Sequence, residues 1–166
     1  MNYRNEDFFQ VFGRICIFFA TLDFFVSEVI IRLIKTNRQI QLSENMTLGQ
    51  KFKIISDLSP DQVIDPDILF DIKKILPEAI DVSRERNRYI HDQWVFNPEL
   101  ISKGKINRFT LNFPPQTAYI NKQTELTIND LDAFLKRIGE LQKKFGAFLD
   151  RLPSINNKRS EHDLHD

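Results

Sequence analysis

The chain has 166 residues and a mass of 19.6 kDa, which is enough for one domain with a substantial core. Its 23 basic and 23 acidic residues cancel to a formal net charge of +0, which excludes nucleic-acid binding through a large basic excess. Cys16 is the only cysteine, so a disulfide scaffold and a cysteine-based zinc cluster are excluded as well. The composition predicts a soluble globular domain, for which we expect a cytoplasmic location.

An apolar stretch over residues 8–34 dominates the N-terminal part of the chain, and four charged residues interrupt it. Its longest charge-free run, residues 15–22, is far shorter than the ~20 residues that span a bilayer, so we expect no membrane segment. Glu6 and Asp7 precede the stretch and no small-residue cleavage site follows it, which argues against a signal peptide. The stretch predicts a long helix over residues 5–36.

The polar residues of this predicted helix share one narrow stripe, because their spacings match the helical repeat. They are Gln10, Arg14, Thr21, Glu28 and Arg32. Such a helix needs apolar cover over most of its circumference, and a second subunit is a natural source of it. Asp23 lies about half a turn from the stripe, so we expect it to face inward and to have a cationic or hydrogen-bonding partner.

Two further helices are predicted in the middle of the chain, after a loop-like segment over residues 37–46. Thr47 is the expected N-cap of a short helix that runs to about Leu58. We expect Lys51 and Lys53 to point outward from it.

Asp65 and Pro66 are the expected N-cap and first residue of the next helix, whose apolar residues recur with a period of 3.6 as far as Ile90. Pro77 is expected to kink this helix or to split it in two.

The pattern changes after Trp94. Residues 105–113 alternate with period two and predict a strand, paired either with 94–96 or with a segment near Tyr119. Thr127 and Asp130 form a capping box for a last helix that ends near Leu152. We therefore expect an all-α domain over residues 1–152 with a strand-bearing insertion over 95–126, and a disordered polar tail over 153–166.

The densest cluster of functional groups lies near the end of the third predicted helix. Arg84, Asn87, Arg88 and His91 fall at i, i+3, i+4 and i+7, so they share one helix face, and Arg86 lies about 140° around from His91. Residues 84–88 carry a local charge of +2. Arginine can neutralise a phosphate oxygen, histidine can exchange a proton near neutral pH, and the amide can orient either group. The alternative is a solvated basic face that favours the helix dipole.

The segment Arg86-Asn87-x-x-x-His91 resembles the signature of the HEPN superfamily, an Arg and a polar residue followed by a His. Trp94, three residues after the His, is similar to the His-x-x-Trp of many small bacterial relatives. Arg84 also fits the permitted spacing, but the Asn directly after Arg86 favours Arg86 as the motif arginine. Asp92 stands where many relatives have Gly, and a carboxylate beside the His would stabilise the imidazolium or occlude the site.

The resemblance implies an up-and-down bundle of four to five helices with a small β-hairpin insertion, and a homodimer whose two motif helices face one composite cleft. It implies a metal-independent endoribonuclease, without cofactor, that cuts single-stranded RNA as a toxin or phage-defence effector. His91 would be the acid/base and Arg86 would hold the phosphate, with Asn87 beside them. A cognate antitoxin or a nucleotidyltransferase-type protein would be a further partner.

Other cluster residues would support the site: Arg84, Arg88, Asp92 and Trp94. Asp23 would be a buried partner of Arg84, Arg86 or His91. The alternative is a catalytically inactive HEPN-like dimer that binds RNA, a nucleotide or a protein.

Overall fold

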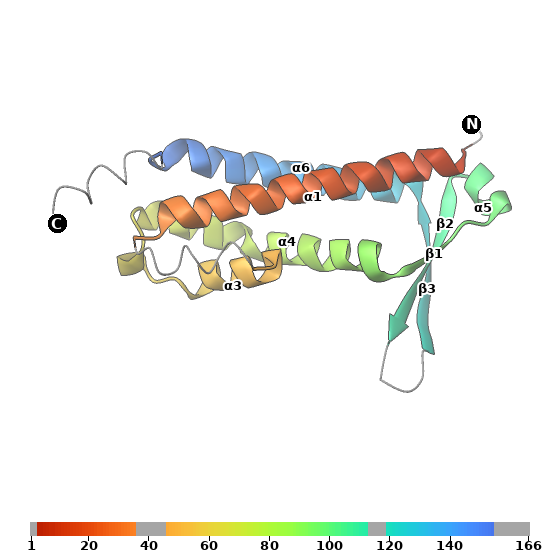
Figure 1. Cartoon of the computed structure of the whole chain (residues 1–166), viewed down its shortest axis with the longest axis horizontal. Helices are drawn as coiled ribbons and strands as arrows, with labels where there is room; N and C mark the ends of the chain where they lie inside the picture. Colours follow the sequence, from red (N-terminus) through yellow and green to blue (C-terminus); the bar gives the residue numbers. More distant parts are fainter. Residues whose placement is uncertain (1–2, 36–45, 113–118, 155–166) are drawn as a thin grey trace. The chain divides into compact units, whose positions relative to one another are not determined.

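The computed structural model describes residues 3–35, 46–112 and 119–154 (Figure 1). The elements in chain order are α1 (Asn5–Leu33), α3 (Leu48–Asp57), the 3-10 turn η1 (Pro60–Gln62), α4 (Pro66–His91), β1 (Gln93–Val95), α5 (Pro98–Ser102), β2 (Lys105–Asn112), β3 (Tyr119–Thr127) and α6 (Ile128–Arg151). The described part of the chain is mostly helical, as predicted, with one three-stranded antiparallel sheet. No helix within it is long and apolar enough to cross a membrane.

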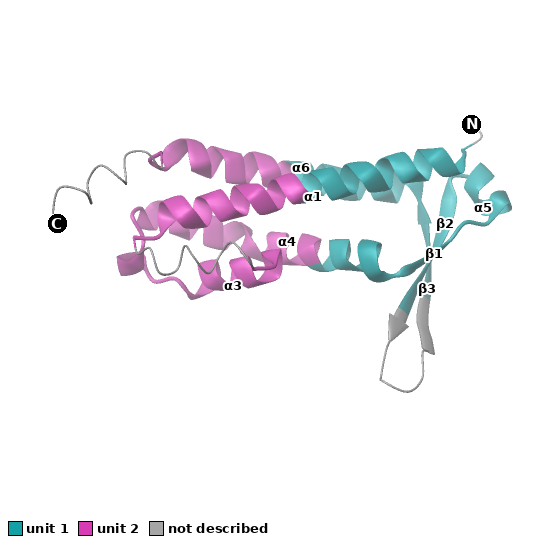
Figure 2. Ribbon diagram, viewed as in Figure 1, with its two compact units in different colours: residues 1–19, 84–139 teal, residues 20–83, 140–166 magenta. Residues whose placement is uncertain are grey.

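The chain forms two compact units, shown in different colours in Figure 2. Unit 1 comprises Met1–Phe19 and Arg84–Gly139, and unit 2 comprises Ala20–Ser83 and Glu140–Asp166. The boundaries fall inside α1, α4 and α6, so neither unit is one continuous stretch of sequence. One domain over residues 1–152 stays a prediction. The predicted loop over 37–46 and tail over 153–166 lie almost entirely outside the described residues.

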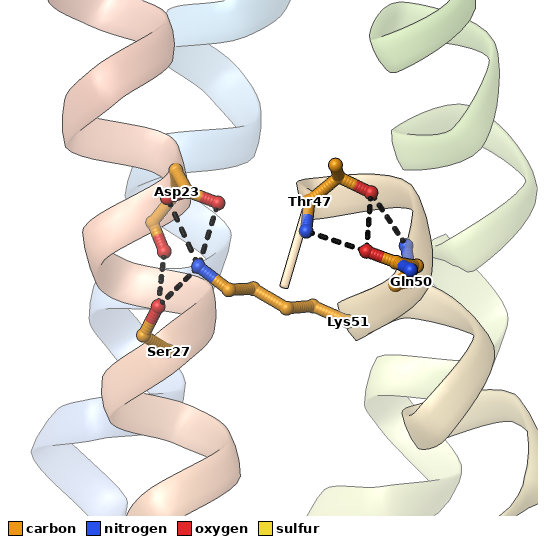
Figure 3. A network of polar contacts seen from close by, with 5 residues as sticks. All are labelled: Asp23, Ser27, Thr47, Gln50 and Lys51. Atoms are coloured by element: carbon orange, nitrogen blue, oxygen red, sulfur yellow. Dashed lines mark hydrogen bonds and ion pairs between the residues drawn. The ribbon is translucent and has the colours of Figure 1, made fainter. Parts of the chain in front are cut away.

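In unit 2, α3 begins at the predicted N-cap. The Thr47 amide donates to Gln50 Oε1 at 2.8 Å and the Gln50 amide donates to Thr47 Oγ1 at 3.4 Å, which completes a capping box (Figure 3). The outward orientation expected for Lys51 is wrong, because the residue as a whole is only 3% exposed. Its ammonium donates to both carboxylate oxygens of Asp23, at 2.9 and 3.0 Å, and to Ser27 Oγ at 2.8 Å. The ion pair joins α3 to α1 and satisfies a charge that would otherwise be costly to bury.

Helix α4 also begins as predicted, with Asp65 Oδ1 accepting from the amides of Asp67 at 3.0 Å and Ile68 at 2.9 Å. The helix runs without interruption through Pro77, so of the two expected outcomes the split is wrong and the kink stays a prediction. A proline forfeits one helical hydrogen bond, and tertiary packing of the flanking turns can offset that cost. Within unit 2 such packing includes ion pairs to α6, Glu78 with Lys144 at 2.8 Å and Asp71 with Arg151 at 3.2 Å.

The sheet lies in unit 1, and its order is β1-β2-β3. Strand β2 pairs with both segments that the sequence offered as alternatives. Its Arg108 lies opposite Trp94 of β1, and its Asn112 lies opposite Tyr119 of β3. The short helix α5, capped by Asn97, was not predicted.

Gly104 turns the chain from α5 into β2 with a φ of +72°. A Cβ there would lie 2.6 Å from the ring of Tyr3, so both the backbone and the close approach require glycine.

Candidate functional site

Four cluster residues share one face on the last turns of α4, as their helical spacing predicts, and all four are exposed: Arg84, Asn87, Arg88 and His91. No hydrogen bond or ion pair joins the side chain of Arg84 or His91 to another residue of the described part of the chain. The two residues are seven positions apart, which places their Cα atoms about 10 Å apart along the helix axis. This face therefore offers a cation and an imidazole to a ligand in solution.

Arg86 is placed differently from the other cluster residues. It is half-buried, and its guanidinium carbon lies 4.9 Å from the centre of the Phe19 ring in α1. Its Nη1 donates to Asn87 Oδ1 at 3.3 Å, and its Nε is buried without a partner among the described residues. In one copy of the chain the arginine of the HEPN-like motif is therefore directed at α1, while His91 faces solvent.

The carboxylate of Asp92 is held by strand β2. Arg108 Nε lies 3.5 Å from Asp92 Oδ2, and the Thr110 hydroxyl donates to the same oxygen at 2.9 Å. Arg108 is 6% exposed, and its Nη1 donates to Glu85 Oε1 at 2.9 Å. Glu85 also pairs with Arg88 at 3.3 Å. The basic cluster is thus embedded in a charge network of two acidic and two basic residues.

Sequence reasoning missed Arg108. One signal for it exists in the period-two pattern, because Ile106, Arg108 and Thr110 must share one face of the strand. Ile106 is fully buried, so an arginine two residues later is on the buried face and needs an acidic partner. The partners themselves lie on another element, and no local pattern identifies them.

Trp94, which the resemblance placed near the site, is half-buried and ties β1 back to α4. Its indole nitrogen donates to the Tyr89 carbonyl at 2.9 Å. The centre of its ring lies 5.6 Å from the ring centre of Tyr89 and 4.6 Å from the ring centre of Phe12. Burial, and next the nearby Glu85 carboxylate, raise the pKa of Tyr89 to about 12. Tyr89 is therefore a neutral packing residue near pH 7, unsuited to act as a general base.

Asp23 does not pair with the cluster as expected. Its carboxylate accepts from Lys51 and its backbone carbonyl accepts from Ser27 Oγ, both in unit 2, whereas Arg84, Arg86 and His91 belong to unit 1. Among the residues that the structure describes, no group of three His, Cys, Asp or Glu side chains is placed to hold a metal ion.

Unit 1 also contains a cavity of about 330 Å³, whose walls come from the first turns of α1 and α6 and from the residues before α1. It is lined by Tyr3, Arg4, Asp7, Gln10, Val11, Arg14, Ile128 and Asp132. None of the cluster residues is in its walls. Its lining contains two arginines and two carboxylates, so its net charge favours neither an anion nor a cation.

The chemistry that the cluster permits is binding of an anion by Arg84 and proton exchange by His91. No protein-family model, no curated protein and no solved structure matches this chain. The likeness to the HEPN superfamily therefore rests on the residues quoted for it: the Arg-Asn-x-x-x-His segment, Trp94 and the helical frame.

Proposed function

We propose that this protein is a HEPN-like, metal-independent endoribonuclease that cuts single-stranded RNA, acting as a toxin or phage-defence effector. The observation that carries the proposal is the exposed α4 face on which Arg84 and His91 stand together without partners in the described part of the chain. His91 takes the proton of a ribose 2′-hydroxyl, the 2′-oxygen attacks phosphorus, and the 5′-oxygen leaves after receiving a proton. The products are a 2′,3′-cyclic phosphate and a free 5′-hydroxyl.

The phosphate-binding arginine is the point at which the geometry departs from the motif. Arg84 shares the exposed face of His91, whereas Arg86 packs on Phe19 and bonds to Asn87. We therefore assign the nonbridging phosphate oxygens to Arg84. Arg86 takes that role only if the ring contact is released.

A homodimer is part of the proposal, because one copy presents a single His91 on a helix surface. Its first helix carries exposed apolar side chains in unit 1: Phe9 is 55% exposed, Ile17 is 66% exposed, and Cys16 between them is exposed as well. Their spacing places the three within about 100° of one helix face. A second copy covering such a face would bring two basic clusters into one assembly.

Digestion of single-stranded RNA in the presence of a chelator tests this function. We compare wild type with His91→Ala, Arg84→Ala and Arg86→Ala, and we use Lys136→Ala, an exposed cation of α6, as the matched control. Removing the acid/base should reduce cleavage by about 10²–10⁴-fold, and Arg84→Ala should cost more than Arg86→Ala. Intact RNA with wild type, or equal cleavage by His91→Ala, would overturn the proposal.

A second candidate is a non-catalytic HEPN-like dimer that binds RNA, a nucleotide or a protein. The observation that favours it is the engagement of Arg86 with Phe19 and Asn87, which gives the motif pair a structural role. In that case RNA binding, measured by fluorescence anisotropy, persists in His91→Ala and no variant cleaves.

A further inference from the structure

The strand-bearing insertion contacts the end of the motif helix through one buried arginine. Arg108 lies on β2 and is 6% exposed. Its Nη1 donates to Glu85 of α4 at 2.9 Å, and its Nε lies 3.5 Å from the carboxylate of Asp92, directly after α4, as an ion pair without a hydrogen bond. Its guanidinium carbon also lies 5.1 Å from the centre of the Tyr89 ring. A buried arginine with these partners is fixed, because leaving them would strand both charges in a poorly solvated site.

Asp92 is the part of this network closest to the proposed chemistry, since it directly follows His91 in the chain. Its side chain is 9% exposed and its Oδ2 accepts from Thr110 at 2.9 Å. Both contacts come from β2, so the sheet determines where this carboxylate lies. An opposite charge within about 4–6 Å of an imidazole stabilises its protonated form, so a released Asp92 carboxylate that turned toward His91 would have this effect.

We propose that Arg108 is a positioning residue for His91, because it holds the Asp92 carboxylate against the sheet and prevents it from pairing with the imidazole. The inference rests on the proposed role of His91 as acid/base. An imidazolium tied to a neighbouring carboxylate is a poor base for a 2′-hydroxyl and is turned away from its substrate. The insertion thereby keeps the His91 imidazole unpaired, whereas a free Asp92 carboxylate would bind it.

Other charged groups also lie around this site. On α4 these are Arg84, Glu85 and Arg88, and Glu85 pairs both with Arg88 at 3.3 Å and with Arg108 at 2.9 Å. From α6, Asp130 and Arg137 act electrostatically on the neighbouring Tyr89. Because Arg108→Met also removes a partner of Glu85, the contribution of Asp92 to any shift of the His91 midpoint is measured in Thr110→Val and in a double variant that lacks the Asp92 charge.

The test is the NMR titration of the His91 ring protons, assigned by comparison with His91→Gln, in wild type, Thr110→Val and Arg108→Met. Thr110→Val changes no charge but removes the 2.9 Å bond to Asp92, so an upward shift of the midpoint reports movement of the carboxylate. We expect a shift of about 0.5–1 pH unit in Arg108→Met and a smaller one in the same direction in Thr110→Val. Lys103→Met, which removes an exposed cation beside β2, is the control and should not move the midpoint.

The double variant Arg108→Met/Asp92→Asn completes the test, because removing the released charge should return the midpoint and the rate of RNA cleavage toward wild type. If Arg108 has a purely structural role, the double variant should instead cleave RNA more slowly than Arg108→Met, since a second residue of the network is lost. An unchanged midpoint in both Thr110→Val and Arg108→Met would overturn the proposal, and Thr110→Val alone decides if Arg108→Met does not fold. A shifted midpoint with uncut RNA in every sample would refute only the ribonuclease function.

Discussion

At the scale of single residues, the most informative contacts in unit 2 are the hydrogen bonds that the ammonium of Lys51 donates. It has three acceptor oxygens within 3.0 Å, two from Asp23 and one from Ser27, which matches the three hydrogens it can donate. The two partners differ in exposure: the Lys51 side chain is 4% exposed and the Asp23 side chain is 39% exposed. Removing one partner therefore has a different consequence from removing the other.

This asymmetry gives a stability prediction. Asp23→Ala leaves a buried ammonium without its counter-ion and should lower the free energy of unfolding by about 3 kcal/mol. Lys51→Met keeps most of the buried stem and leaves a carboxylate that water can reach, so the loss should be about 1 kcal/mol. Urea unfolding followed by circular dichroism measures both values.

Lys53→Met, two residues along α3 and exposed, is the control and should have almost no effect on stability. A larger loss for Lys51→Met than for Asp23→Ala would show that the packing of the lysine stem contributes more to stability than the charge pair does.

At the scale of elements, the sequence predicts where helices begin much better than it predicts which residues meet. Thr47, Asp65 and Thr127 were each identified as N-caps, and each makes the expected hydrogen bonds, because a cap and its acceptor lie within three residues. The inward placement of Lys51 and the network of Arg108 depend on residues 28 and 23 positions away. Local periodicity carries no information about such partners.

The same distinction applies to the candidate site. Helical spacing correctly placed Arg84 and His91 on one face, because both lie on one element, but it could not show that this face is exposed. It could not show that Arg86 packs on Phe19, since that ring comes from another helix. It also placed Asp92 beside His91 only in sequence, whereas β2 holds the carboxylate.

The capping box of α6 gives a prediction of pH dependence. Hydrogen bonds from the Thr127 hydroxyl, at 2.7 Å, and from the Thr127 amide, at 2.8 Å, lower the pKa of Asp130 below its ordinary value of 3.8. A depressed folded-state pKa adds stability that is fully present above the unfolded pKa and is lost as the pH falls through the folded value. Wild type should therefore be more stable than Asp130→Asn at pH 6, and the difference should shrink below about pH 4.

Urea unfolding at pH 6, 4 and 3 measures this difference. Asp132→Asn is the matched control, since it removes a carboxylate from the same part of α6 and leaves the capping box intact. A difference between wild type and Asp130→Asn that stays constant from pH 6 to pH 3 would mean that the carboxylate charge does not contribute to the cap.

At the scale of the whole molecule, the proposed dimer would account for two features together, the neutral total charge and the apolar first helix. The net charge of +0 excludes only binding that depends on a large basic excess, while the exposed Arg84 and the half-buried Arg86 concentrate positive charge at one end of α4. Two copies would double this local charge without changing the average. The exposed apolar face of α1 in unit 1 is the surface that we expect to bring them together.

The dimer gives the prediction that links assembly to function. Sedimentation equilibrium of wild type at micromolar concentration should give about 39 kDa, twice the chain mass of 19.6 kDa, and Ile17→Arg should give the mass of one chain. An arginine on the 66% exposed Ile17 would be desolvated and unpaired in an apolar interface but harmless on a free surface. Ala133→Arg, at an exposed position of α6 and so outside the exposed face of α1, is the control and should remain dimeric. If the cleft needs two copies, Ile17→Arg also loses RNA cleavage. Its urea unfolding midpoint should then equal that of wild type at protein concentrations low enough for wild type to be monomeric. A wild-type mass near 20 kDa would contradict the dimer, and cleavage by that monomer would place the whole active site on one α4 face.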